Sequence, residues 1–95
     1  MTAPVYVLPA ELTIAQVETC KESIMDLVKQ HDAIGLDDSK LVRIDTLGIQ
    51  LLLGLVIHIS SLNKQLDWQS DSVIIKQSIK QLGITEPILN QYINA

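Results

Sequence analysis

The sequence predicts a small α/β domain with a mixed, mostly parallel β-sheet and helices packed mainly on one face. Short apolar runs typical of strands alternate with longer helical patterns in the order β-α-β-α-β-α, and such crossovers favour parallel strands. The 95 residues are enough for one domain, which we place at residues 1–95. The composition is 47% hydrophobic without any Phe, so we expect a core of Ile, Leu and Val.

A short strand and an amphipathic helix open the chain. The strand is predicted from Val5 to Leu8 and ends at Pro9. Thr13 and Gln16 have the spacing of a capping box, in which two side chains bond each other's backbone at the start of a helix. Apolar residues then recur at spacings near three and four with charged residues between them, which predicts a helix over residues 13–30.

The middle of the chain predicts a buried strand followed by a buried helix. Residues 33–36 form a short apolar run between Asp32 and Asp37, as in strands that are covered on both faces. From Leu47 to Asn63 no turn signal occurs and apolar residues fall on nearly every face, which predicts a central helix. Gly54 lies inside this helix, where glycine is less favourable than alanine by roughly 1 kcal/mol, so we expect close packing there.

A strand, a helix and a tail complete the predicted order. Residues 66–69 alternate between apolar and polar, as in a strand with one solvated face. Ser70 is the expected N-cap of the next helix, which stops at Gly83. Residues 84–95 contain Pro87 and are only weakly periodic.

Charge and cysteine content narrow the functional class. A formal net charge of −4 with only seven Lys and Arg argues against nucleic acids and anionic membranes, since both require clustered basic residues. The most apolar stretch, residues 47–62, is shorter than the roughly 20 residues of a membrane span. The single Cys20 excludes an internal disulfide, and the first ten residues lack signal-peptide features. We therefore expect a soluble cytoplasmic protein without membrane insertion.

The sequence patterns do not indicate catalysis. His31 and His58 each lack a second ligand at metal-binding spacing, and Cys20 is interpreted as a core thiol. The four glycines lie too far apart for a phosphate-binding loop. We therefore expect no enzymatic activity, no metal and no cofactor.

One family signature covers the junction between the buried strand and the central helix. A strand ends in Leu-Asp, a loop with a hydroxyl residue follows, and Asp-Thr-x-Gly opens an apolar helix. The residues concerned are Leu36, Asp37, Ser39, Leu41, Ile44, Asp45, Thr46, Leu47 and Gly48. This pattern resembles the core signature of STAS domains. The family includes anti-sigma factor antagonists, chemosensory regulators, tails of anion transporters, and a subunit of a bacterial phospholipid-trafficking transporter.

The resemblance implies a non-enzymatic bacterial module that works in signal transduction by binding and releasing a protein partner. In the antagonists, the residue right after the motif's Asp is phosphorylated by the partner kinase, and Thr46 holds that position here. The chain departs from the pattern at Leu47, where the family usually has a small residue, and at Thr46, where the antagonists mostly have Ser. The implied partner-binding residues are Asp37, Ser39, Lys40, Arg43, Asp45, Thr46, Leu47 and Gly48.

Several of these residues also have a purely structural interpretation. Asp45 or Thr46 can serve as an N-cap, Asp37 as a turn residue, and Lys40 and Arg43 as solvated loop residues. The expected partner is an anti-sigma factor or kinase, a chemosensory protein, or a transporter ATPase, and a homodimer is also compatible with the sequence. The alternative function is that of a subunit that binds and stabilises the ATPase of a lipid-trafficking ABC transporter.

Overall fold

Three parallel strands form the main sheet of the computed structural model, which describes residues 3–68, 70, 72–83 and 92. The strands are β1 (Val5–Val7), β3 (Ala33–Asp37) and β5 (Gln65–Asp67), in the spatial order β1-β3-β5. A second parallel pair consists of β2 (Glu11–Leu12) and β4 (Arg43–Ile44). All the strand pairings among the described residues are therefore parallel.

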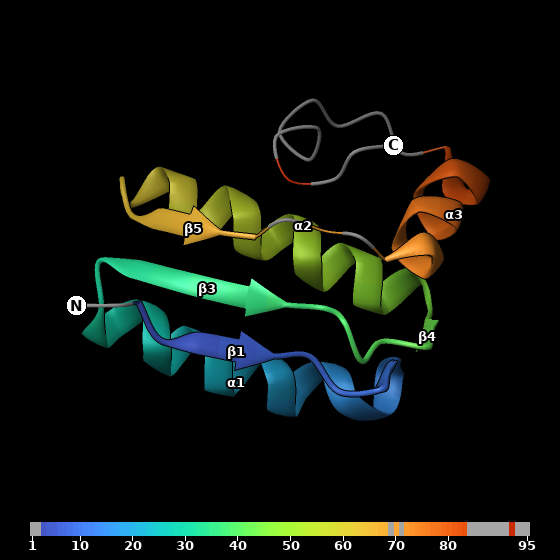
Figure 1. Cartoon of the computed structure of the whole chain (residues 1–95), viewed down its shortest axis with the longest axis horizontal. Helices are drawn as coiled ribbons and strands as arrows, with labels where there is room; N and C mark the ends of the chain where they lie inside the picture. Colours follow the sequence, from blue (N-terminus) through green and yellow to red (C-terminus); the bar gives the residue numbers. More distant parts are fainter. Residues whose placement is uncertain (1–2, 69, 71, 84–91, 93–95) are drawn as a thin grey trace.

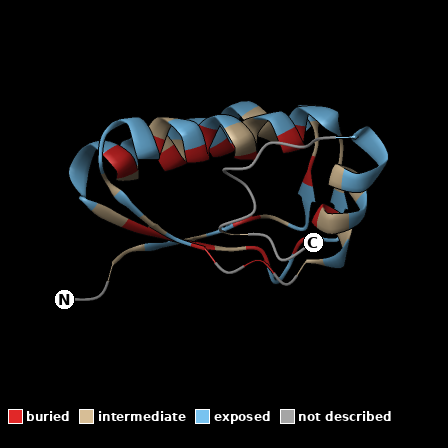
Figure 2. Cartoon of the chain, turned by 90° about the horizontal axis from the view of Figure 1, so that it is seen from above, coloured by how far each residue is buried: buried red, intermediate tan, exposed pale blue. Residues whose placement is uncertain are grey.

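Three helices follow the strands: α1 (Ile14–Gln30), α2 (Thr46–Ser61) and α3 (Val73–Leu82). Figure 1 shows α1 and α2 running side by side in the same direction behind the main sheet, while α3 lies beyond the strand ends, next to β4. In Figure 2, the buried residues of the helical layer face the strands and its exposed residues face outward. One face of α1 and of α2 is therefore open to the surroundings.

The core lies between the main sheet and the pair α1–α2. Burying a large aliphatic side chain contributes about 1.5 to 3 kcal/mol, so this layer supplies most of the stabilisation. As the composition predicts, the core is almost wholly aliphatic. Its buried residues are Leu8, Leu12, Cys20, Ile24, Val28, Ile34, Leu36, Leu41, Ile49, Leu52, Leu55, Val56, Ile59, Trp68 and Ile75.

The predicted α/β class, with helices mainly on one face, is confirmed, but some details differ. Ser72, and not Ser70, caps α3, because its Oγ accepts a hydrogen bond from the N–H of Ile75 at 3.2 Å. The predicted stop at Gly83 is confirmed by its φ of 68°, a left-handed conformation that favours glycine. Strands β2 and β4 were not predicted, since two residues are too few to show periodicity. The predicted tail lies outside the described residues, apart from Tyr92.

Candidate partner-binding surface

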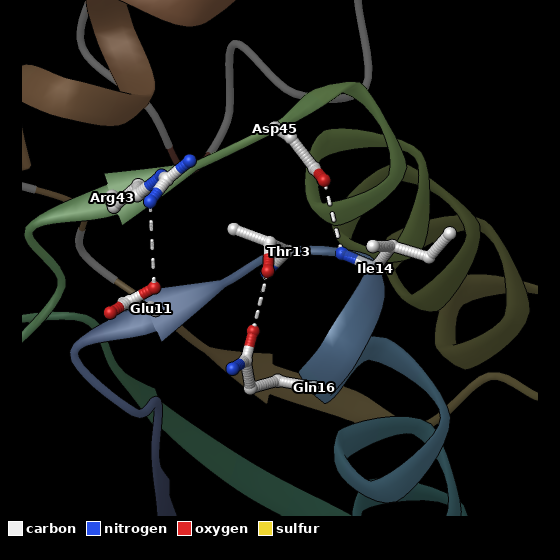
Figure 3. Close-up of polar contacts among 6 residues, drawn as sticks. All are labelled: Glu11, Thr13, Ile14, Gln16, Arg43 and Asp45. Atoms are coloured by element: carbon white, nitrogen blue, oxygen red, sulfur yellow. Dashed lines mark hydrogen bonds and ion pairs between the residues drawn. The ribbon is translucent and has the colours of Figure 1, made fainter.

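Strands β2 and β4 bring the starts of α1 and α2 together. Each of these short strands leads almost directly into a helix, β2 into α1 and β4 into α2. Because Leu12 pairs with Ile44 in parallel register, the two helices begin next to each other. Figure 3 shows this junction, with Asp45 of the α2 start pointing toward the first residue of α1. The tetrapeptide from Asp45 to Gly48 therefore lies where two helix N-termini meet.

Asp45 caps both helices with one carboxylate. Its Oδ1 accepts a hydrogen bond from the N–H of Gly48 at 2.9 Å, and its Oδ2 accepts one from the N–H of Ile14 at 3.0 Å. The first turn of each helix has N–H groups without partners inside the helix, and both helix dipoles favour a negative charge at this point. The capping interpretation of Asp45 is therefore confirmed, and the second helix it caps was not foreseen.

Two further contacts hold the same junction (Figure 3). The Oε1 of Gln16 accepts hydrogen bonds from the N–H of Thr13 at 3.0 Å and from its hydroxyl at 2.7 Å, close to the capping box predicted from the sequence. Arg43 lies 3.9 Å from Glu11 across the β2–β4 pair. Both side chains of this ion pair are largely exposed, so it contributes about 1 kcal/mol at most. The backbone of the junction is thus fixed mainly by its caps.

Thr46 and Leu47 are the exposed residues of the tetrapeptide from Asp45 to Gly48. Thr46 is the first residue of α2 and is open to solvent, and the side chain of Leu47 is 40% exposed. Gly48 is buried instead. A Cβ at this position would lie 2.2 Å from the backbone oxygen of Leu12 and 2.6 Å from Cγ1 of Ile44. The prediction that Gly48 contacts a partner is therefore corrected: it lets α2 approach β2 and presents no side chain.

The loop after β3 carries the other predicted residues. Oδ1 of Asp37 accepts a hydrogen bond from the N–H of Ser39 at 2.8 Å, which is the turn role that the sequence allowed. Hydrogen bonds from Ser39, and secondarily the charge of Lys40, lower the pKa of Asp37 below its ordinary value. Ser39, Lys40 and Arg43 are exposed. Asp37 and Ser39 line a hollow together with Ser72 and Val73 at the start of α3.

Asp38 anchors this loop and was missed by sequence reasoning. It is buried, and its Oδ2 accepts hydrogen bonds from Nε1 of Trp68 at 3.1 Å and from the hydroxyl of Ser70 at 2.6 Å. The ring of Trp68 in turn stacks on Tyr92, with centroids 6.0 Å apart. The donors lie 30 and 32 residues away along the chain, so no local spacing could have revealed the contact. Asp38 consequently fixes the start of the loop, while the next two residues, Ser39 and Lys40, stay accessible to solvent.

Two hollows are lined in part by residues that the sequence predicted for the partner-binding surface. The first, of about 650 Å³, lies over the open side of β3 next to the start of α3, and Asp37, Ser39 and Ser72 are among its lining residues. The second, of about 410 Å³, is a groove between the outer sides of α1 and α2. Its lining residues are Val17, Glu18, Lys21, Met25, Leu47, Gln50, Leu51, Gly54, Leu55 and His58. Leu47 therefore connects the motif surface with a groove that runs along α2.

Metal-binding and membrane-spanning features were also sought in the part of the chain that the structure describes. Within it, no three His, Cys, Asp or Glu side chains are grouped so that they could hold a metal ion. In the same residues, none of the helices combines the length and apolar character needed to cross a membrane.

The fold matches two solved structures of SpoIIAA. The anti-sigma factor antagonist SpoIIAA in its unphosphorylated form superposes with a TM-score of 0.71 at 19% sequence identity, over 98% of this chain and 79% of that chain. The Bacillus cell fate determinant SpoIIAA in its phosphorylated form gives a TM-score of 0.70 at 19% identity, over 98% and 82%. Neither the family models nor the curated proteins gave a match to the sequence. The chain therefore has the fold of SpoIIAA, as the resemblance to STAS domains predicted.

Proposed function

We propose that this chain is a partner-switching regulatory module, similar to an anti-sigma factor antagonist, which binds a protein through the surface around Thr46 and releases it when Thr46 is phosphorylated. The observation that carries this proposal is the exposed hydroxyl residue directly after Asp45, at a junction of two capped helix N-termini. The SpoIIAA-like fold supports it further, because that antagonist is known in an unphosphorylated and a phosphorylated form.

The charge at the junction explains how a phosphate would act. Asp45 already supplies one negative charge to both helix starts. A phosphate on Thr46 would add about −1.5 to −2 charges beside that carboxylate. The two groups would repel each other and compete for the same N–H donors, while the phosphate would also displace any surface packed on Thr46. A partner that docks on the unmodified junction would consequently be released.

Leu47 supplies an apolar contact beside the switch residue. Its side chain is partly exposed and lines a groove together with the polar side chains of Glu18, Lys21 and Gln50. An accessible large apolar residue within a polar surround is a common form of binding hot spot. We therefore assign Leu47 as the anchor of the partner contact, with the exposed residues Ser39, Lys40 and Arg43 as further contacts.

The phosphorylation step is tested by comparing Thr46→Glu with Thr46→Ala. Wild-type protein is used to capture the partner from native lysate, and the purified partner is then titrated with each variant by calorimetry. Thr46→Glu is expected to weaken binding at least about tenfold, whereas Thr46→Ala binds like the wild type, because only glutamate adds negative charge next to Asp45. Equal affinities for all three proteins would rule out control through charge at Thr46.

The position of the partner surface is tested with Leu47→Asp. An acidic residue in the first turn of a helix suits the helix dipole, so thermal melting by circular dichroism should stay close to wild type while binding is lost. The matched control is Leu62→Asp, because Leu62 is 46% exposed at the C-cap of α2, fifteen residues or about 22 Å along the helix from Leu47. Leu62→Asp should keep full binding. Loss of binding in both variants, or in neither, would place the partner elsewhere.

A further inference from the structure

Ile14 is the most exposed large hydrophobic residue of the described chain, at 72%. It is the first residue of α1, and it belongs neither to the buried core nor to the partly buried residues packed against that core. A hydrophobic staple does not account for it either. Such a staple pairs the residue before the N-cap with the fourth residue of the helix, and these positions hold Leu12 and Val17. The fold of the described residues therefore gives no reason for a large aliphatic side chain at this position.

The first turns of α1 and α2 are both uncharged. The start of a helix favours acidic residues, because its free N–H groups and its dipole attract negative charge. Neither helix has an acidic residue in its first turn, and no Lys or Arg occurs there. The two helices share the carboxylate of Asp45 instead. Each first turn thus presents one exposed large aliphatic residue, Ile14 in α1 and Leu47 in α2.

Asp45 holds the two aliphatic residues in a fixed relation. Its two oxygens accept hydrogen bonds from the first turn of each helix, and the bond from the N–H of Ile14 measures 3.0 Å. In Figure 3, Ile14 and Asp45 lie on one side of the junction and the ion pair between β2 and β4 lies on the other. Thr46 follows Asp45 directly, one Cα step of about 3.8 Å away. The exposed residues Ile14, Thr46 and Leu47 therefore surround a single carboxylate.

We propose that Ile14 is a second apolar anchor of the partner contact, so that the partner covers both helix starts with an uncharged, apolar surface. This inference rests on the proposed function and adds the chemistry of the surface that the partner presents. Two accessible aliphatic side chains favour an apolar partner surface, since both are removed from water on binding. A charged group of the partner would lose its hydration over these first turns, where Asp45 is already engaged by both helices.

The same chemistry strengthens the effect of a phosphate on Thr46. The phosphate would place about −1.5 to −2 charges beside two aliphatic anchors. Covering that charge with an apolar partner surface would remove its hydration without supplying an opposite charge, which is strongly unfavourable. Release of the partner then follows from desolvation as well as from repulsion by Asp45.

The variant Ile14→Ala tests the second anchor. Calorimetry uses the partner that the wild type captures, after purification. Binding should weaken at least about tenfold, as for truncation of an interface hot spot, while thermal melting stays close to wild type because Ile14 lies outside the core. The matched control Ile57→Ala makes the same change at a residue that is 47% exposed, about 15 Å along α2 from Leu47, and should bind like the wild type. Equal affinities of Ile14→Ala and the wild type would overturn the inference.

Methyl NMR reports the contact with both isoleucines in place. In protein labelled with 13C at the isoleucine δ1 methyl groups, the signals of Ile14 and Ile57 are assigned by their absence in the two alanine variants. Adding the purified partner should shift the Ile14 signal and leave the Ile57 signal where it is. An unshifted Ile14 signal in the saturated complex would contradict the second anchor.

Salt tests the uncharged character of the contact. Interactions between exposed charges are screened as the Debye length falls from about 10 Å at 0.1 M to about 3 Å at 1 M ionic strength, whereas apolar contacts are not. Raising the sodium chloride concentration over this range should therefore weaken binding by no more than about threefold. A larger loss would mean that exposed charges such as Lys40 and Arg43 carry the contact, and would overturn the proposed apolar surface of the partner.

Failure of this inference and failure of the proposed function give different results. If Thr46→Glu weakens binding and Ile14→Ala does not, control through Thr46 is retained and the second anchor is wrong. If Ile14→Ala weakens binding and Thr46→Glu does not, the partner covers both helix starts and control by phosphorylation is wrong.

Discussion

The first turn of α2 and its middle turns are determined by different surroundings, and the two glycines of the helix show the difference. At Gly48 an added Cβ would lie 2.2 Å from the backbone of β2, so the fold of the chain itself requires glycine. At Gly54 an added Cβ would meet no atom of the described residues within 4 Å, and the glycine is unfavourable in isolation. The first turn is therefore explained by contacts within the chain. No such contact among the described residues accounts for the glycine in the middle turns.

The inner side of the middle turns provides the largest expected effect. Leu52 lies opposite the exposed stripe and is buried in the core. Leu52→Ala should reduce the free energy of unfolding by about 2 to 5 kcal/mol, the range for removing a large buried side chain. Urea denaturation followed by circular dichroism measures the change. A midpoint within error of the wild type would mean that α2 does not pack on the sheet as described.

Gly48→Ala tests whether the first turn needs glycine. The methyl group would collide with the backbone oxygen of Leu12 and with the side chain of Ile44, and a backbone atom cannot yield without moving β2. We expect a loss of about 3 kcal/mol, at the upper end of the usual range for overpacking. The same denaturation experiment applies. A variant as stable as the wild type would show that α2 and β2 are further apart than the structure places them.

Substitutions of Asp45, which caps both helices, should have a smaller effect on the free energy of unfolding, and its size should depend on the new side chain. Asp45→Ala removes two N-terminal hydrogen bonds, each of which contributes about 0.5 to 2 kcal/mol in such positions, so a loss of about 1 to 4 kcal/mol is expected. Asp45→Asn retains one oxygen acceptor and should fall between alanine and the wild type. If asparagine and wild type unfold at the same urea concentration, one of the two bonds does not contribute to stability.

These residues also show which parts of the molecule could be predicted from sequence. The bond from Gly48 to Asp45 spans three residues, so the motif alone indicated it. The bond from Ile14 to Asp45 spans 31 residues and depends on the pairing of β2 with β4. Strands of only two residues are too short to be predicted from sequence periodicity. Sequence periodicity predicted the long helix α1, whose apolar pattern repeats over several turns, whereas α2 was predicted from a long apolar stretch without a turn signal.

The same limit explains two wrong predictions. Ser70 and Ser72 are both suitable N-caps by type, and only the fold decides between them. Ser70 instead donates a hydrogen bond from its hydroxyl to Asp38, which no local pattern connects with it. The close packing expected at Gly54 is not found among the described residues, because a helical glycine by itself does not specify which neighbour approaches it.

The smallest expected effect, a gain of stability at Gly54, bears most directly on the comparison of the two glycines. Gly54→Ala should raise the free energy of unfolding by about 1 kcal/mol, because alanine is the better helix former and its methyl group would meet no atom of the described residues within 4 Å. Urea denaturation of the variant and the wild type measures the gain. A loss of stability would mean that Gly54 is required by the fold itself, and the two glycines would then not differ as described.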